Sequence, residues 1–358
     1  MSLPPGSPAP WFHAASPSNP RFAFASLGGT YVVLAFLPPP GPAREAALRA
    51  VVDHRDMFRD ERCLFFGVLP DAESCARATT APPFRWFLDP EGELARLFNA
   101  VGPDGAYQPQ WVAIDPTLKV LGSAPIEAGQ AVLDKMASLG APGDHAGVPL
   151  HAPVLIVPRV LEPSLCRRLI EVYAETGGAP SGVMRQMDGK TVGVLDDFKR
   201  RRDATIQDEA LRSELRSRLE RRLLPDILKA FQFEATRIER YIVACYDASD
   251  GGYFKAHRDN TTTATAHRRF AVSINLNAEE FEGGDLRFPE FGRKTYRPPT
   301  GGAVVFSCSL LHEATPVTRG TRYATLPFLF DEAGEKIRAA NAHTLARPEL
   351  PEAAPATD

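Results

Sequence analysis

The sequence predicts two domains of different class, an α/β sandwich followed by a β-barrel or jelly roll with flanking helices. In the first half, apolar strand-like runs alternate with stretches of helical spacing, as in a layered α/β fold. In the second half, two helical stretches lead into short strand-like runs separated by Gly and Pro. Between the halves, near residues 138–152, a segment rich in Gly, Pro and Ala lacks apolar periodicity, and we expect the domain boundary there.

The composition indicates a soluble protein of the cytoplasm. A length of 358 residues allows two domains with a core each, and the net charge of −3 suggests no nucleic-acid or membrane partner. The longest apolar run, Tyr31–Leu37, is far shorter than the roughly 20 residues that span a bilayer. The start of the chain lacks the pattern of a signal peptide. The five cysteines are scattered without a CxxC pair, which argues against a disulfide framework and fits a reducing compartment.

The elements of the first half follow in α/β order. Strand-like and helix-like stretches alternate along the chain at Tyr31–Leu37 (strand), Ala43–Phe58 (helix), Leu64–Leu69 (strand), Glu91–Asn99 (helix) and Trp111–Ile114 (strand).

The second half begins with helices and continues with strands. Pro163–Thr176 has helical spacing, and a longer helix is predicted from the capping residue Asp208 because leucines recur at four-residue steps up to Leu223. From Arg237 onward the pattern becomes short strands with Gly and Pro turns. The segment after about residue 334 is predicted to be a disordered tail.

A candidate metal site lies in the strand-rich region. His257 and Asp259 form an HxD triplet after a strand run, and residues two apart on a strand point to the same face. His312, which is 53 positions after Asp259, is the candidate third ligand. Two imidazoles and one carboxylate make the facial triad of non-haem Fe(II) oxygenases, which leaves open coordination positions. An HxD triplet alone is common by chance, so the hypothesis depends on the rest of the pattern.

Arg322 supplies the next part of that pattern. It follows His312 by ten residues, on the next strand run after a short turn, so we expect the two strands to be neighbours. A fixed guanidinium beside a metal suits a bidentate bond with a carboxylate. The simpler alternative is a surface arginine, but the apolar residues that flank Arg322 favour a buried position.

Residues 237–330 resemble the catalytic core of prolyl 4-hydroxylase-like Fe(II)/2-oxoglutarate dioxygenases. The stretches YDASDGGYFKAHRDN, SINLNAEEFEGGDLRFPEFG and PPTGGAVVFSCSLLHEATPVTRGTRY carry the resemblance. It implies a double-stranded β-helix, iron bound by His257, Asp259 and His312, and 2-oxoglutarate held by Arg322, with ascorbate as a further candidate cofactor. Tyr246 and Asn275 fall at positions that line the cosubstrate pocket in this family, although many members carry Tyr where Asn275 stands.

The same resemblance implies hydroxylation of an unactivated C–H bond with conversion of 2-oxoglutarate to succinate. Prolyl residues of a peptide or protein are the family's usual substrate, and free amino acids or other small molecules remain alternatives. A non-catalytic scaffold with a vestigial barrel is the alternative from another class. His267, Arg268 and Arg269 are candidate anchors for a carboxylate-bearing substrate, with a solvated loop as the competing interpretation. The basic stretch KRRRD at 199–203 is predicted to be solvent-exposed.

The first half resembles a thioredoxin-fold domain of the peroxiredoxin type, through YVVLAFL, LFFGVL, FLDPEGELARLFNA and QPQWVAIDPTLKVL. Pro109 is then the candidate for a cis-proline before a strand. In that family a peroxide-reducing Cys begins the helix after the first of these runs, whereas this chain has no Cys before Cys63. We therefore predict a redox-inactive module for substrate docking or homodimer formation, with an active peroxidase as the rejected alternative.

These interpretations divide the chain into four parts. Residues 1–138 form the thioredoxin-like domain, 139–152 a linker, 153–333 the dioxygenase domain and 334–358 the tail.

Overall fold

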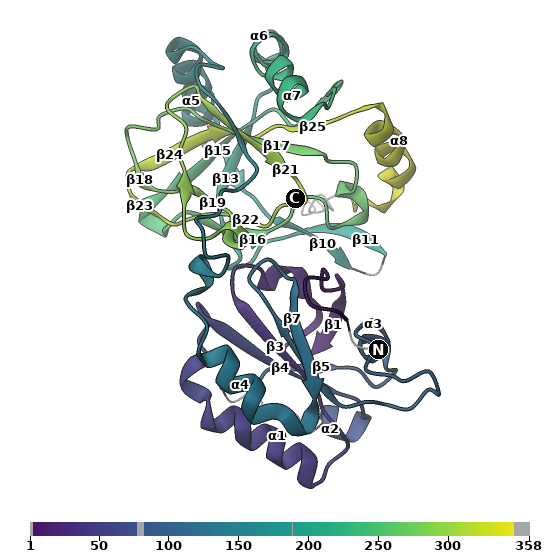
Figure 1. Ribbon diagram of the computed structural model, residues 1–358. Helices are drawn as coiled ribbons and strands as arrows, with labels where there is room; N and C mark the ends of the chain where they lie inside the picture. The colour runs from purple at the N-terminus through teal and green to yellow at the C-terminus, as the bar shows by residue number, and fades with distance from the viewer. Residues whose placement is uncertain (1–2, 77–81, 188, 347–358) are drawn as a thin grey trace, which may run out of the picture. The chain divides into compact units, whose positions relative to one another are not determined.

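The computed structural model describes residues 3–76, 82–187 and 189–346 (Figure 1). The chain divides into two compact units, residues 1–152 with 288–294 and residues 153–287 with 295–358. No helix in the described part of the chain is long and apolar enough to cross a membrane.

The first unit is built on one seven-stranded mixed sheet, and the strand order is β2-β1-β5-β4-β3-β6-β7. The strands β3, β4 and β5 are parallel to one another, and the remaining pairs are antiparallel. The strand bounds are β1 His13–Ser16, β2 Asn19–Ala23, β3 Tyr31–Phe36, β4 Cys63–Leu69, β5 Trp86–Leu88, β6 Gln110–Ile114 and β7 Val120–Pro125. The helices are α1 Pro42–Asp53, α2 Ala72–Ala76, α3 Glu93–Leu97 and α4 Gly129–Ala137.

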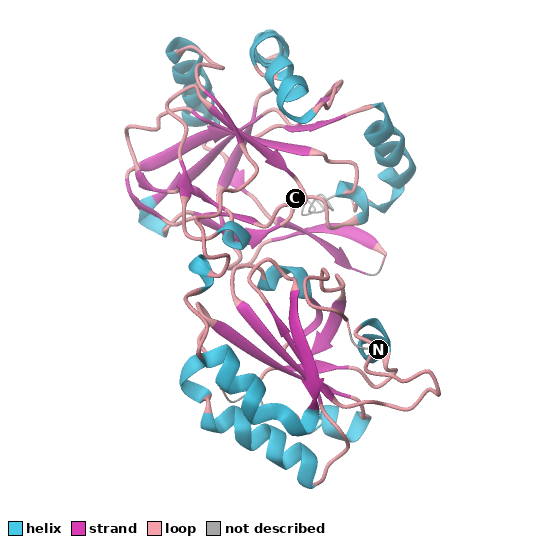
Figure 2. Cartoon of the chain, in the orientation of Figure 1, coloured by secondary structure: helices cyan, strands magenta, loops and turns pink. Residues whose placement is uncertain are grey.

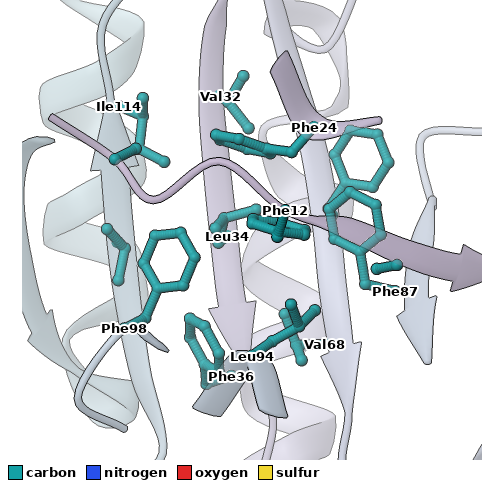
Figure 3. Close-up of a cluster of buried hydrophobic side chains, with 14 of the residues drawn as sticks. Phe12, Phe24, Val32, Leu34, Phe36, Val68, Phe87, Leu94, Phe98 and Ile114 are labelled. Atoms are coloured by element: carbon teal, nitrogen blue, oxygen red, sulfur yellow. The ribbon is translucent and has the colours of Figure 1, made fainter. Parts of the chain in front are cut away.

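Both faces of this sheet are apolar, which explains why β3 and β4 read as continuous hydrophobic runs. Alternate residues of β3 enter opposite cores. Val33 and its same-face neighbours pack with α1 and α4, which lie side by side on that face. Val32, Leu34 and Phe36 enter the other core, which is rich in phenylalanine (Figure 3). The α/β order predicted from the sequence is confirmed.

The second unit contains two larger sheets and two two-stranded sheets (Figure 2). The nine-stranded sheet has the order β14-β25-β17-β24-β15-β13-β9, with β21 pairing with β17 and β8; the five-stranded sheet has the order β12-β16-β22-β19-β20. The strands of the nine-stranded sheet are β8 Leu155–Val157, β9 Ala179–Pro180, β13 Arg202–Thr205, β14 Arg237–Glu239, β15 Ile242–Asp247, β17 Phe270–Asn275, β21 Ala303–Ser307, β24 Thr321–Thr325 and β25 Phe328–Phe330. The five-stranded sheet comprises β12 Lys199–Arg200, β16 Tyr253–His257, β19 Leu286–Arg287, β20 Thr295–Tyr296 and β22 His312–Ala314. One two-stranded sheet is the hairpin of β10 Val183–Met187 with β11 Lys190–Val194, and the other pairs β18 Glu282–Gly283 with β23 Val317–Arg319. This is the predicted jelly-roll class.

Helices cover the outer face of the nine-stranded sheet and bury a leucine-rich core against it. They are α5 Pro163–Thr176, α6 Glu209–Arg222 and α7 Leu224–Phe231. The leucines that predicted α6 are buried because their four-residue spacing places them on one side of the helix. Asp208 caps this helix by accepting hydrogen bonds from the backbone N–H groups of Ala210 and Leu211.

Two expectations from the sequence differ from the structure. Residues Glu332–Asn341 form helix α8, where a disordered tail was predicted. Its N-terminus is stabilised because the side chain of Asp331 accepts a hydrogen bond from the N–H of Gly334 at 2.7 Å, a cap that the tail interpretation overlooked. A 3-10 helix follows at Ala342–Thr344, and residues 347–358 of the predicted tail lie outside the described residues. Within the described ranges the cis peptide bond joins Pro82 and Pro83, and the expectation for Pro109 was wrong.

Candidate metal centre and its cavity

Three predicted ligands meet at one end of the five-stranded sheet. His257 is the last residue of β16 and His312 the first of β22, and the two are paired directly across these antiparallel strands. Asp259 follows two residues after His257. The nitrogen and oxygen atoms that the three side chains offer all lie within 4.8 Å of one another. The Nε2 atoms of His257 and His312 lie 3.5 and 3.3 Å from the Asp259 carboxylate oxygens.

Backbone carbonyls orient both imidazoles. The Nδ1 of His257 lies 2.7 Å from the carbonyl of Lys255, and the Nδ1 of His312 lies 3.0 Å from the carbonyl of Leu310. Because a carbonyl only accepts, each Nδ1 donates its proton, which leaves Nε2 of each ring as the atom that can bind a metal beside the carboxylate. The ring of Phe254 stacks on His257. The tautomer and direction of both imidazoles are therefore those of metal ligands.

The charge states at this centre also suit a cation. Burial raises the pKa of Asp259, but its interactions with His312 and His257, including a hydrogen bond with His257, lower the pKa by more, so that it lies below its ordinary range. Burial and the charge of His257 lower the pKa of His312 to about 4. At neutral pH the centre therefore holds an ionised carboxylate and a neutral His312. Two imidazole nitrogens and a carboxylate form a donor set that fits Fe(II) with coordination positions left over.

Arg322 lies on β24, in the other large sheet, and is 2% exposed. The expectation that its strand neighbours the His312 strand was wrong, because β22 and β24 belong to different sheets. The two side chains nevertheless line one cavity. The Nε of Arg322 donates to Asn275 Oδ1 at 3.2 Å, and Nη2 donates to Ser273 Oγ at 2.8 Å. Its Nη1 is buried without a hydrogen-bond partner among the described residues.

A glycine turn leaves room for this arginine. Gly283 and Gly284 both have positive φ, 70° and 66°, which glycine adopts at little cost. A Cβ on Gly284 would lie 3.2 Å from Cδ of Arg322 and 2.8 Å from Val317. The paired glycines therefore permit both the turn and the close approach of the guanidinium stem.

Tyr246 and Asn275 take different places around Arg322. Tyr246 lines the cavity, and its ring centroid lies 5.1 Å from the Arg322 guanidinium. The Nδ2 of Asn275 donates to the carbonyl of Pro298 at 3.0 Å, which directs its Oδ1 toward Arg322. Asn275 is thus placed to orient the arginine. Ser273, which the sequence analysis missed, lines the cavity two residues earlier on β17, and the same-face spacing of a strand was the available signal.

The basic stretch at 199–203 was expected to be solvent-exposed, which holds for Arg200 and Arg202 but not for Lys199 and Arg201. Lys199 and Arg201 are 8% and 6% exposed. Arg201 binds Asp203 through Nε and Nη2, at 2.7 and 2.6 Å, and its Nη1 donates to the Tyr246 hydroxyl at 3.3 Å. Burial and the charge of Arg201 lower the pKa of Lys199 to about 6. Alternate residues of this stretch face inward, because β12 pairs with β16 beside the metal centre.

The proposed substrate anchors at 267–269 are engaged elsewhere. Nε2 of His267 and Nη2 of Arg268 lie 2.7 and 2.6 Å from the carboxylate of Glu239. Arg269 donates from Nη1 to the carbonyl of Ala266 at 3.0 Å. None of the three is among the described residues that line the cavity. We therefore assign them to the structure of this end of the barrel.

The thiols of the first unit lack the setting of a peroxide-reducing cysteine. Cys63 lies buried in β4, and burial raises its pKa to about 12. Burial and the charge of Asp71 raise the pKa of Cys75, in α2. A reactive thiol needs a lowered pKa, because the thiolate is the nucleophile. The helix after β3, α1, begins with Pro42 and contains no Cys.

Comparisons with known proteins match the two halves of the chain to two different families. Residues 241–330 match the 2OG-Fe(II) oxygenase superfamily, and residues 5–122 match the AhpC/TSA family. A PKHD-type hydroxylase of Synechococcus sp. is 28% identical over 133 residues, which are 35% of this chain and 56% of that protein. The chain spans about half the length of the curated relatives it matches.

Two solved structures are similar at lower identity. A Pseudomonas putida prolyl-4-hydroxylase shares 20% identity over 56% of this chain and 98% of its own, with a TM-score of 0.36. Mycobacterium tuberculosis AhpC shares 18% over 38% of this chain and 95% of its own, with a TM-score of 0.32. The family matches confirm both resemblances that the sequence suggested: residues 241–330 are similar to 2OG-Fe(II) oxygenases and residues 5–122 to the AhpC/TSA family.

Proposed function

We propose that this protein is an Fe(II)- and 2-oxoglutarate-dependent dioxygenase that hydroxylates an unactivated C–H bond. The observation that carries the proposal is the meeting of His257, Asp259, His312 and Arg322 at one cavity. A surface histidine cluster would not need a buried guanidinium beside it. A vestigial barrel would not be expected to keep all four side chains oriented.

Each residue has a definable task. His257, Asp259 and His312 would hold Fe(II) through Nε2, a carboxylate oxygen and Nε2, the atoms that converge in the structure. Arg322 would bind the distal carboxylate of 2-oxoglutarate, because its Nη1 is buried and lacks a hydrogen-bond partner in the described chain. Bound iron would supply the activation of O2 that couples decarboxylation of 2-oxoglutarate to C–H oxidation. Ascorbate is proposed as the accompanying reductant.

The walls of the cavity support that chemistry by excluding water. Phe254 covers one face of His257, Phe306 packs against His312, and both rings line the cavity. In a site closed by apolar rings, the charge-assisted bonds of Arg322 are stronger than in water. These residues therefore orient the cosubstrate carboxylate and shield the reacting groups.

For the substrate we propose a prolyl residue of a peptide or protein, with a free amino acid as the second candidate. For the first unit we propose substrate docking or dimer formation without peroxidase activity. Residues 139–152 are proposed as the linker between the two domains, and the cytoplasm as the compartment.

The test uses the full chain, purified without oxygen and reconstituted with Fe(II). We expect about one iron per chain and succinate release that requires both 2-oxoglutarate and O2. Asp259→Ala should lose bound iron and lower succinate release by at least about 100-fold, since changes in residues that only support a metal site already cost 10- to 100-fold. The matched control is Asp250→Ala, which removes an exposed carboxylate nine residues before Asp259. Full iron content and activity in Asp259→Ala would overturn the assignment, as would no 2-oxoglutarate-dependent succinate release from the wild-type protein.

A further inference from the structure

Three guanidinium groups line the cavity of the metal centre, and they differ in how their charge is balanced. Arg201 forms a two-point ion pair with Asp203. Arg322 is the proposed ligand of 2-oxoglutarate. Arg240 forms no hydrogen bond and no ion pair with any residue that the structure describes, and its Nε is buried without a partner. Its guanidinium lies over the ring of Phe328, 4.9 Å from the centroid.

The carboxylates around Arg240 are committed to other groups. Besides Asp203, the charges acting on Arg240 include those of Asp259 and Arg268. Asp259 belongs to the candidate metal triad. Glu239, the preceding residue, holds both His267 and Arg268. Arg240 is therefore a positive charge that this part of the chain does not neutralise. Arg240 is partly buried, and a cation whose Nε is buried without a partner at a cavity wall suits an anionic ligand.

The backbone at this position gives an independent sign of constraint. Arg240 connects β14 to β15 and has φ of 75°, in the left-handed region that a non-glycine residue adopts rarely. Asn or Gly would occupy this conformation at lower cost. The left-handed backbone and the charge without an ion-pair partner both oppose folding, and against them stands the cation–π contact with Phe328. Such strain is typically retained at ligand-binding positions.

We propose that Arg240 binds a carboxylate of the primary substrate, at a point of the cavity separate from the 2-oxoglutarate carboxylate at Arg322. This inference rests on the proposed dioxygenase function and adds the chemical class of its substrate. Arg240 presents a planar guanidinium, which suits two parallel N–H···O bonds to a carboxylate. Phe328 and Leu326, which also line the cavity, provide apolar surface for the carbon skeleton of the same molecule.

The carboxylate could be the free α-carboxylate of a small molecule or a side-chain carboxylate of a peptide, and matched pairs of probes distinguish the two. One pair is N-acetyl-L-proline and N-acetyl-L-prolinamide, which differ in a free α-carboxylate. The other pair is a blocked Gly-Pro-Glu peptide and its Gly-Pro-Gln counterpart, which differ in a side-chain carboxylate. Binding is measured by calorimetry on the full chain loaded with Zn(II) and 2-oxoglutarate, because Zn(II) has no redox chemistry and the complex does not turn over. The titrations are repeated without metal.

We expect at least one acid to bind the wild-type protein about 10- to 100-fold more tightly than its amide, as for a charge-assisted hydrogen bond in a closed site. Arg240→Gln should remove that preference and leave amide binding, iron content and the affinity for 2-oxoglutarate unchanged. Arg240→Lys should keep part of the preference, since it keeps the charge without the fork. Arg237→Gln is the matched control, because Arg237 is exposed and paired with Glu332.

Thermal unfolding of the metal-free protein separates binding from a structural role. Removing an unpaired buried charge should leave the unfolding midpoint of Arg240→Gln equal to or above that of the wild type, whereas a structural arginine would lower it. Equal binding of each acid and its amide by the wild-type protein would overturn the inference. A retained preference in Arg240→Gln, or no binding of either acid with or without metal, would overturn it as well. If the proposed dioxygenase function itself were wrong, the wild-type protein would show no iron- and 2-oxoglutarate-dependent succinate release.

Discussion

Replacing Arg322 with Gln tests the cosubstrate site most directly. The side chain is 2% exposed, and two of its three nitrogens already donate, Nε to Asn275 and Nη2 to Ser273. These bonds hold the plane of the guanidinium and leave Nη1 without a partner in the described chain. A carboxylate of 2-oxoglutarate would therefore gain the bond from Nη1 and share Nη2. Glutamine keeps one N–H donor group but removes the charge and the pair of parallel N–H donors of the guanidinium.

The expected magnitude follows from the lost charged bond. A hydrogen bond to a charged group contributes on the order of 1.5–3 kcal/mol. At about 1.4 kcal/mol per decade, the apparent 2-oxoglutarate constant of Arg322→Gln should rise roughly 10- to 100-fold. The cost is expected at the upper end, because the cosubstrate carboxylate would also remain unpaired in a buried site. Iron content should hardly change, since Arg322 is not a candidate ligand.

The assay is succinate release as a function of 2-oxoglutarate concentration at saturating Fe(II). Arg322→Lys should recover part of the loss because it restores the charge but cannot donate as a planar fork. Arg319→Gln is the control, since Arg319 lies three residues away and is exposed in an ion pair with Glu282. An unchanged 2-oxoglutarate dependence in Arg322→Gln would refute the reasoning, and Arg240 would then be the first cation to examine as the cosubstrate ligand.

Two further predictions concern regions outside the cosubstrate site. Burial raises the pKa of Glu239, but the hydrogen bond from His267 and the charge of Arg268 lower it well below the ordinary value of 4.5. The stabilising effect of the ionised Glu239 is therefore present above about pH 4.5 and is lost on further acidification. In urea unfolding, Glu239→Gln should lower the free energy of unfolding by about 3–5 kcal/mol at pH 7. Below about pH 4.5 the free energy of unfolding of this variant should fall less steeply than that of the wild type. An acid profile as steep as that of the wild type would argue against this cluster. In the first unit, Cys63→Ser and Cys75→Ser should leave any peroxide consumption unchanged, because both thiols have raised pKa values; a loss of peroxide consumption in either variant would contradict the redox-inactive interpretation.

The sequence by itself determined the class of both domains and the residues of the candidate metal centre. Period-two and four-residue apolar spacings are local properties, so the α/β order of the first half and the leucine face of α6 could be inferred without a structure. The HxD triplet was informative because its two ligands are close in sequence, although β16 ends at His257 and Asp259 lies just beyond the strand. His312 and Arg322 were found through their sequence intervals from that triplet and the resemblance those intervals supported.

The environment of these residues was decided only by the tertiary structure. His312 and Arg322 lie on different sheets, and pairing between strands distant in sequence brings both to one cavity. The stretch at 199–203 looked like solvated surface, but pairing of β12 with β16 buries two of its basic side chains. The contacts of charged groups are likewise non-local, since Glu239 binds His267, 28 residues later in the chain, and Arg240 has no ion-pair partner among the described residues. A sequence shows which residues carry charge, but the free energy of a charge depends on burial and on partners, and both are set when distant strands pack together.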